Sequence, residues 1–276
     1  MKTVLVPDER RYATMNSRDL GEGFLLDSLF NPGEINLAWC DLDRAIIGSA
    51  VPVRNTLALQ PHDVMRCETF LQRRELGILN IGGAGRIEVD GESFELQTTD
   101  GLYAGLGCRK IVFSSLHANH PAKFYLLSYP AHVAYPTEVI RHDSIVPLEL
   151  GSPAGANQRK LYKYIHPDGV RSCQLVMGFT RLAPGSVWNT MPPHTHLRRS
   201  EVYLYFNLAP DARVVHLMGR SDETRHLMVA DCQVVLSPGW SIHAGAGTTA
   251  YSFCWGMGGE NQVFADMNTV AVADLR

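Results

Sequence analysis

The stretch Met191-Pro-Pro-His-Thr-His-Leu-Arg-Arg-Ser-Glu201 is the segment from which the fold and the chemistry are most directly inferred. His194 and His196 are two residues apart, so in an extended chain both imidazoles lie on one face. Glu201 faces them if residues 197–200 form a turn into an antiparallel strand. The segment Ser237-Pro-Gly-Trp-Ser-Ile-His243 offers a third imidazole. Three histidines and one carboxylate predict a site for Zn, Fe, Mn, Ni or Co.

A His-x-His pair among 11 histidines is also compatible with a chance occurrence on a solvated loop. The residues after Glu201 favour the metal site. Val-Tyr-Leu-Tyr-Phe is typical of a strand in which Glu201, Tyr203 and Tyr205 share a face. An unpaired buried charge is costly, so a carboxylate on this aromatic, inward-facing surface requires a partner.

The composition is that of a globular protein, with 276 residues, of which 45% are hydrophobic and 19% charged. A net charge of -3 without a long basic run gives no reason to expect nucleic-acid binding. We expect no membrane span, because no run of about 18 apolar residues exists, and no signal peptide. The six cysteines are scattered without a C-x-x-C pair, which favours a reducing, cytoplasmic compartment.

Closely spaced turn signals predict a mainly β fold with few short helices. Asp90-Gly91 is a hairpin signal between residues 87–89 and 93–96, and strands are predicted at residues 76–81, 201–207, 214–218 and 233–236. A short helix is predicted within residues 19–29. We expect two domains. Residues 1–150 form a degenerate half with an irregular N-terminal segment, and residues 151–276 form the metal-binding half.

The two halves share short similar segments, which suggests a duplication. Gln72-Arg-Arg-Glu75-Leu-Gly-Ile-Leu is similar to Leu197-Arg-Arg-Ser-Glu201-Val-Tyr-Leu. This alignment puts Glu68 and Phe70 where the second half has His194 and His196, and a second short match puts Cys108 opposite His243. The first half would then have kept the fold and lost the ligands. General similarity between β-rich sequences is the alternative.

The spacing His-x-His-x4-Glu, followed about forty residues later by a Pro-Gly…His segment, resembles the two metal motifs of cupins. This resemblance implies all-β architecture with two cupin-type antiparallel jelly-roll barrels in one chain. In such barrels the ligands lie on the inward faces of strands.

A longer resemblance covers nearly the whole chain. Five segments, at residues 73–85, 187–196, 223–226, 237–243 and 259–264, are similar in sequence and order to the 5-keto-4-deoxyuronate isomerase family. The resemblance implies a bicupin that binds one Zn²⁺ per chain through His194, His196, Glu201 and His243. It also implies a homohexamer and an acidic sugar substrate from pectin-type polyuronides, with isomerisation of an aldose to a ketose.

The hard step of this reaction is removal of the C2 proton, and a divalent metal would stabilise the resulting enediolate as a Lewis acid. Metal-bound water could serve as the base. The candidate side chains for moving the proton are Glu201, Glu223 and Glu260; surface roles for the last two are the alternative. Arginine has the fork that matches the substrate carboxylate. The candidates for substrate contacts are Arg198, Arg199, Arg225, Tyr203 and Trp188.

Two other functions fit the same ligand set. A cupin dioxygenase would use three histidines and a glutamate to bind iron, and it would consume oxygen. A sugar-binding or regulatory cupin without catalysis is the other alternative. The complete four-ligand set argues against that alternative, and so does the absence of a helix-turn-helix pattern.

Overall fold

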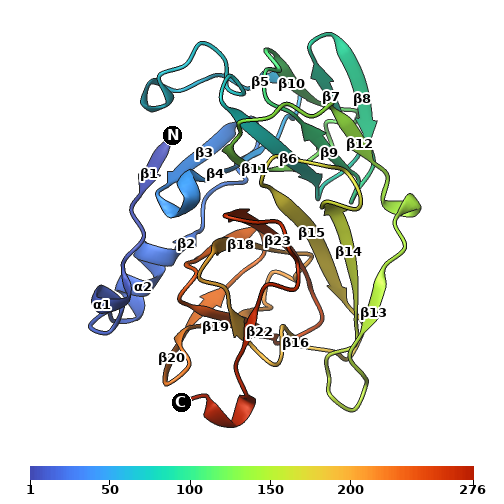
Figure 1. Ribbon diagram of the computed structural model, residues 1–276. Helices are drawn as coiled ribbons and strands as arrows, with labels where there is room; N and C mark the ends of the chain where they lie inside the picture. Colours follow the sequence, from blue (N-terminus) through green and yellow to red (C-terminus); the bar gives the residue numbers. More distant parts are fainter. The chain divides into compact units, whose positions relative to one another are not determined.

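The computed structural model describes residues 1–276, and it is built almost entirely from β-strands. It contains 24 strands, two short α-helices and four 3-10 helices (Figure 1). The mainly β fold expected from the turn spacing is therefore confirmed. None of the helices has the length and apolar character needed to cross a membrane.

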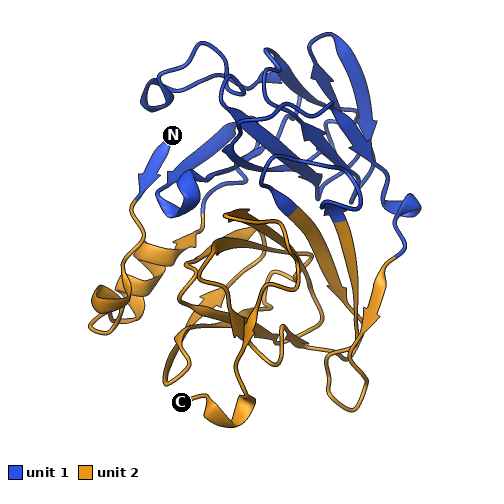
Figure 2. Cartoon of the chain, in the orientation of Figure 1, with its two compact units in different colours: residues 1–4, 28–146, 164–176 blue, residues 5–27, 147–163, 177–276 orange.

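The chain divides into two compact units, which are coloured separately in Figure 2. Unit 1 comprises residues 1–4, 28–146 and 164–176, and unit 2 comprises residues 5–27, 147–163 and 177–276. The central division lies close to residue 150. A single division at residue 150 would assign residues 5–27 to unit 1 and residues 164–176 to unit 2. In the structure, residues 5–27 belong to unit 2 and residues 164–176 to unit 1. Strand pairing or hydrogen bonds hold each of these segments in its unit. A division made by position along the chain does not show these contacts.

Unit 1 consists of a seven-stranded and a four-stranded sheet with a hydrophobic core built from both. In sheet order the seven strands are β1 (Lys2–Val4), β3 (Ile35–Cys40), β4 (Ile46–Ala50), β11 (Phe124–Pro130), β6 (Arg74–Asn80), β9 (Gly101–Ala104) and β12 (Glu138–Ile140). The four strands are β5 (Leu57–Ala58), β10 (Ile111–Ser115), β7 (Gly85–Val89) and β8 (Glu92–Leu96). The connecting 3-10 helices are η1 (Leu42–Arg44), η2 (Asp63–Met65) and η3 (His142–Ser144).

The turn between β7 and β8 is the hairpin that Asp90-Gly91 predicts. Asp90 has φ 51° and Gly91 has φ 92°, which is the left-handed pair that a two-residue hairpin turn needs. The Asp90 carboxylate also accepts the N–H groups of Arg109 and Lys110, at 2.9 and 2.8 Å. This side chain therefore links the turn to the segment that leads into β10.

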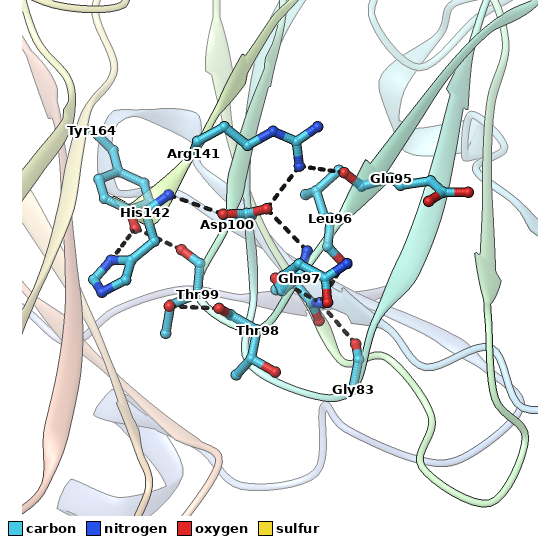
Figure 3. A network of polar contacts seen from close by, with 11 residues as sticks. Gly83, Glu95, Leu96, Gln97, Thr98, Thr99, Asp100, Arg141, His142 and Tyr164 are labelled. Atoms are coloured by element: carbon cyan, nitrogen blue, oxygen red, sulfur yellow. Dashed lines mark hydrogen bonds and ion pairs between the residues drawn. The ribbon is translucent and has the colours of Figure 1, made fainter. Parts of the chain in front are cut away.

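A polar network around Asp100 holds the end of unit 1 that includes η3 (Figure 3). The Asp100 carboxylate accepts hydrogen bonds from the guanidinium of Arg141 at 2.8 Å and from the backbone N–H groups of His142 and Gln97, at 2.9 and 3.0 Å. The Tyr164 hydroxyl donates to the carbonyl of Thr99 at 2.6 Å. These contacts fasten the loop before β9 to the segment that follows β12.

Unit 2 repeats the same arrangement of sheets. In order its seven strands are β13 (Leu148–Leu150), β14 (Arg159–Ile165), β15 (Val176–Leu182), β23 (Ser252–Gly259), β18 (Arg199–Phe206), β21 (Gln233–Ser237) and β2 (Leu25–Leu26). The four strands are β16 (Trp188–Asn189), β22 (Ile242–Gly247), β19 (Val214–Arg220) and β20 (Glu223–Val229). A two-stranded ribbon pairs β17 (His194–Thr195) with β24 (Asn268–Thr269), and η4 (Val272–Asp274) follows it.

The N-terminal helices α1 (Glu9–Tyr12) and α2 (Ser17–Phe24) belong to unit 2. Asn16 and Asp19 form a capping box at the start of α2, which places the helix two residues earlier than the sequence analysis expects. The helix ends at Phe24 because the next two residues form β2, which pairs with β21. Leu20 and Phe24 are buried, and Trp240 packs edge-on against Phe24.

The two units have corresponding strand orders, which supports the duplication. β6 and β18 occupy the same place in their sheets, between β11 and β9 in unit 1 and between β23 and β21 in unit 2. Glu75 lies on β6 and Glu201 on β18, as the alignment of the two segments requires. The match of Cys108 with His243 does not hold, because Cys108 precedes β10 while His243 lies within β22.

Candidate metal centre

The site is built on β18, the strand predicted to follow the His-x-His segment. β18 is paired on both sides, with β21 and β23, and Glu201 lies opposite Ser237 and Met257. Glu201, Tyr203 and Tyr205 alternate along the strand and are all buried, at 4%, 2% and 0% exposure. The Tyr203 ring centroid is 6.1 Å from that of Tyr205 and 5.3 Å from that of His243, and His243 contacts Glu201, so the predicted shared face is confirmed.

Three imidazoles reach this carboxylate from different elements. His194 lies in β17, opposite Thr269 of β24, and His243 lies in β22, opposite Met218 of β19. His196 begins a turn in which the Arg199 N–H donates to the His196 carbonyl at 3.0 Å. This turn brings Glu201 back to the histidines. Ligand atoms of His194, His196, Glu201 and His243 lie within 4.8 Å of one another.

The spacing of the ligand atoms fits one divalent cation. Glu201 Oε2 is 2.9 Å from Nε2 of His196 and 2.9 Å from Nε2 of His243, and the Nε2 atoms of His243 and His194 are 3.0 Å apart. These separations show that the donor atoms of the four side chains converge on one region, as the ligands of a single divalent cation would.

Neighbouring groups orient the imidazoles for coordination. His196 Nδ1 donates to the carbonyl of Arg199 at 3.0 Å, so the unprotonated nitrogen of the neutral ring is Nε2, which faces the cluster. His243 Nδ1 is 3.2 Å from the hydroxyl of Ser237. Such contacts behind a ligand commonly fix its tautomer and ring orientation.

The protonation states of His194 and Glu201 also suit a cation. Burial lowers the pKa of His194 to about 3, with the neighbouring His243 adding to the effect. Burial acts to raise the pKa of Glu201, but His243 and His196 outweigh it and hold that pKa well below its usual range. Near neutral pH the cluster therefore offers an ionised carboxylate beside a neutral His194 imidazole, and metals bind those forms.

A cavity of about 290 Å³ opens from this cluster within unit 2. Its lining includes His194, Glu201 and Tyr203, together with Thr190 and the apolar ring of Trp255. The Tyr203 hydroxyl is 3.4 Å from Thr190 Oγ1. Burial raises the pKa of Tyr203 well above its usual value, so this hydroxyl stays protonated and can donate a hydrogen bond.

The guanidinium groups of Arg198 and Arg199 both contact Asp266. Arg198 forms a two-bond ion pair with Asp266, with one bond of 2.7 Å from Nε. Arg199 is 2% exposed, and its Nη2 donates to the carbonyl of Asp266 at 3.0 Å. Neither is among the residues that line the cavity. The carbonyl of Arg199, rather than its guanidinium, contacts the site.

The other predicted residues also lie outside the cavity lining. Arg225 pairs with Glu223 at 2.7 Å on β20 and donates to backbone carbonyls of Ala13 and Met15. Glu260 is exposed, and its N–H donates to the carbonyl of Arg198 at 2.9 Å. Trp188 lies on β16, where it pairs with β22. Of the candidate catalytic carboxylates, only Glu201 reaches the cavity.

One lining residue was not singled out from the sequence. Arg159, the first residue of β14, lines the cavity together with Leu161 of the same strand. Their i, i+2 spacing indicates a shared face, but it does not indicate which cavity that face borders. No motif near Arg159 connects it to the histidines.

In unit 1 the residue that corresponds to Glu201 has another role. Glu75 is fully buried and accepts hydrogen bonds from the Tyr103 hydroxyl at 2.7 Å and from the backbone N–H groups of Cys173, Gln174 and Leu175, at 2.6, 2.8 and 2.8 Å. Its oxygens are occupied by neutral donors instead of imidazoles. Glu75 therefore holds residues 173–175 in unit 1.

Comparison with known proteins places these features in a family. The KduI/IolB family matches residues 31–274. The 4-deoxy-L-threo-5-hexosulose-uronate ketol-isomerase of Lachnoclostridium phytofermentans is 52% identical over 276 residues, covering 100% of this chain and 99% of the relative. The enzymes of the same name from Halalkalibacterium halodurans and Escherichia coli O157:H7 are 49% and 48% identical, covering 98% and 95% of this chain and 96% and 95% of the relatives.

Solved structures share the fold at low sequence identity. An IolB-like protein from Salmonella typhimurium LT2 is similar with a TM-score of 0.74 and 13% identity, over 90% of this chain and 96% of that chain. An oxalate decarboxylase from Lactobacillus farciminis has a TM-score of 0.56 and 11% identity, over 83% of this chain and 79% of that chain. The match over residues 31–274 and the relatives that are 48–52% identical over nearly the whole chain establish that this chain belongs to the KduI/IolB family.

Proposed function

We propose that this chain is a 4-deoxy-L-threo-5-hexosulose-uronate ketol-isomerase that acts in the breakdown of pectin-type polyuronides. The substrate carries an aldehyde at C1, a hydroxyl at C2 and a carboxylate at C6. In the substrate's numbering, the product, 3-deoxy-D-glycero-2,5-hexodiulosonate, carries a hydroxyl at C1 and a ketone at C2. One proton moves from C2 to C1 and one from the C2 oxygen to the C1 oxygen, so the reaction needs no oxidant or reductant.

The observation that carries this proposal is the full-length similarity of 48–52% identity to enzymes of this activity. The geometry of the site is consistent with it. A cluster of three imidazoles and one carboxylate borders a cavity of about 290 Å³, which is near the lower end of the size usual for small-molecule sites.

We propose that His194, His196, Glu201 and His243 hold one Zn²⁺. A divalent metal bound there supplies Lewis-acid stabilisation of the negative charge that develops on the C1 and C2 oxygens. Zinc suits the reaction because no change of oxidation state is required. The chain's own contribution is to keep the four ligand atoms 2.9–3.0 Å apart along the contacts described above.

We propose that two side chains act on the substrate. Glu201 is the only one of the three predicted carboxylates in the cavity lining, and we assign the proton transfer between C2 and C1 to it. Its Oε2 contacts two imidazoles, so the proton would be accepted at Oε1. Tyr203 keeps its proton and donates a hydrogen bond to a substrate oxygen.

We further propose a homohexamer in the cytoplasm, as the resemblance to the uronate isomerases implies. The absence of a membrane-crossing helix is compatible with this location. Size-exclusion chromatography with light scattering measures the assembly directly. A monomer at micromolar concentration would contradict the hexamer.

The decisive experiment is proton NMR of the purified protein with the uronate in D₂O. We expect conversion to the diketo acid, its loss after chelation and its recovery after Zn²⁺ is added back. Deuterium at C1 of the product would support proton transfer through the enediolate. If a metal-loaded sample shows no conversion, the isomerase proposal is wrong. Oxygen uptake by an iron-loaded sample would then support the dioxygenase alternative.

A further inference from the structure

The substrate of the proposed reaction has a carboxylate at the end opposite to its reacting carbons, and the cavity contains one cation that fits it. Arg159 is the only lysine or arginine among the residues that line the cavity. The same cavity is bordered by His194 and Glu201 of the metal cluster. A ligand that fills it therefore contacts the cluster and the guanidinium together.

The Arg159 guanidinium has no acidic partner. Its Nη1 donates to the backbone carbonyl of Asn157 at 2.9 Å, and no carboxylate lies within ion-pair distance. The side chain is partly buried, and burial lowers its pKa, with the hydroxyls of Tyr203 and Tyr251 opposing that effect. An arginine keeps its charge under such conditions. Arg159 is thus a partly desolvated cation with N–H groups left to donate.

Two other arginines of unit 2 are paired with carboxylates. Arg198 pairs with Asp266, and Arg225 pairs with Glu223. Lys163 is four residues after Arg159 on the same strand, so the alternation of a strand puts both on one face. The ammonium group of Lys163, however, lies over the ring of Phe264, 4.5 Å from the centroid. Lys163 is not among the lining residues.

Resting on the function proposed above, we propose that Arg159 binds the C6 carboxylate of the uronate. Its planar fork matches the two carboxylate oxygens, and the partly buried setting strengthens charge-assisted hydrogen bonds. Selectivity for an acidic sugar over a neutral one then arises at Arg159. The metal cluster selects for the oxygens at the other end of the molecule.

The test compares two substrates and four variants. The substrates are the uronate and a neutral analogue in which C6 is a hydroxymethyl carbon instead of a carboxylate carbon. Arg159→Gln removes the charge, and Arg159→Lys keeps the charge without the fork. Arg181→Gln is the matched control, because Arg181 lies on β15 of the same sheet, is exposed and does not line the cavity. Lys163→Gln tests the neighbouring cation.

We expect Arg159→Gln to lower kcat/KM for the uronate by about 10- to 100-fold, mainly through KM, because a hydrogen bond to a charged group is lost. The value of kcat/KM for the neutral analogue should change by less than about 3-fold, which is of the order of the scatter in such comparisons. Arg159→Lys should give an intermediate value, and both controls should match the wild type. An equal loss on both substrates would show a structural role and overturn the proposal. A loss confined to Lys163→Gln would also overturn it.

Binding by calorimetry separates this proposal from the proposed activity. If the wild type does not convert the uronate, the proposed function fails. Titration of the wild type and Arg159→Gln with D-galacturonate and D-galactose then decides the role of Arg159. Tighter binding of galacturonate that is lost in the variant supports a carboxylate site. Equal binding of both sugars, or binding of neither, contradicts it.

Discussion

Replacing Glu75 by glutamine tests whether the first unit retains its buried carboxylate for structure. The side chain is 0% exposed and accepts four hydrogen bonds, one from the Tyr103 hydroxyl and three from successive backbone N–H groups of residues 173–175. Glutamine has nearly the same shape. It presents one oxygen and one NH₂ group. The NH₂ group then faces N–H or O–H donors and cannot accept their hydrogen bonds.

The expected cost follows from these contacts. At least two of the four donors lose their acceptor, and a buried donor without an acceptor costs about 1–3 kcal/mol. Glu75→Gln should therefore lower the free energy of unfolding by about 2–6 kcal/mol. At about 2–4 °C per kcal/mol, the unfolding temperature should fall by about 10 °C. Tyr103→Phe removes one donor and should cost about 1 kcal/mol.

Scanning calorimetry and metal analysis check this prediction together. Glu75→Gln should unfold at a lower temperature and bind as much metal as the wild type at 25 °C. Glu201→Gln should lose its bound metal, which Glu75→Gln retains. A variant of Glu75 that unfolds within 1 °C of the wild type would refute the reasoning, and so would a loss of metal with unchanged stability.

Three further changes have defined outcomes. His194→Ala removes an imidazole and should weaken metal binding by more than about 100-fold, measured by dialysis against a chelator; retention of the metal would exclude His194 as a ligand. Ser237→Ala removes the hydroxyl 3.2 Å from His243 Nδ1 and should weaken metal binding by about 10-fold in the same assay. Asp100→Ala breaks the ion pair with Arg141 and leaves two backbone N–H groups without their acceptor, so the free energy of unfolding should fall by about 2–4 kcal/mol in urea titrations, with metal content unchanged.

The parts of the fold that local chemistry determines were predictable. Asp90-Gly91 adopts the left-handed pair that a two-residue hairpin requires, and alternation along residues 201–207 placed three side chains on one face. The segment 5–27 was not predictable in this way. β2 has two residues, which is too short to show a period, and it completes a sheet edge that is formed by strands more than 200 residues later. Nothing local to Leu25 and Leu26 indicates that partner.

The candidate site was predictable where its residues share a motif. His194, His196 and Glu201 lie on one short segment, so the turn geometry alone brings them together. Arg159 lies on another strand of the same sheet. Its position in the alternation of that strand does not indicate which cavity it borders. For Arg198 and Arg225 the sequence shows charge without showing the carboxylates that neutralise it. Glu223 is only two residues from Arg225, but Asp266, the partner of Arg198, is distant in sequence and becomes visible only in the folded chain.

The comparison of Glu75 with Glu201 shows how one strand position supports two roles. Each carboxylate is buried on the corresponding strand, where an ionised group needs partners. Backbone N–H groups and one hydroxyl satisfy Glu75, and these donors carry no lone pair that could coordinate a cation. Imidazoles surround Glu201, and each neutral ring can offer a lone pair to a cation held beside the carboxylate oxygen. The side chains that reach the carboxylate from other elements therefore decide whether the barrel can bind a metal, while the strand order is the same in both units.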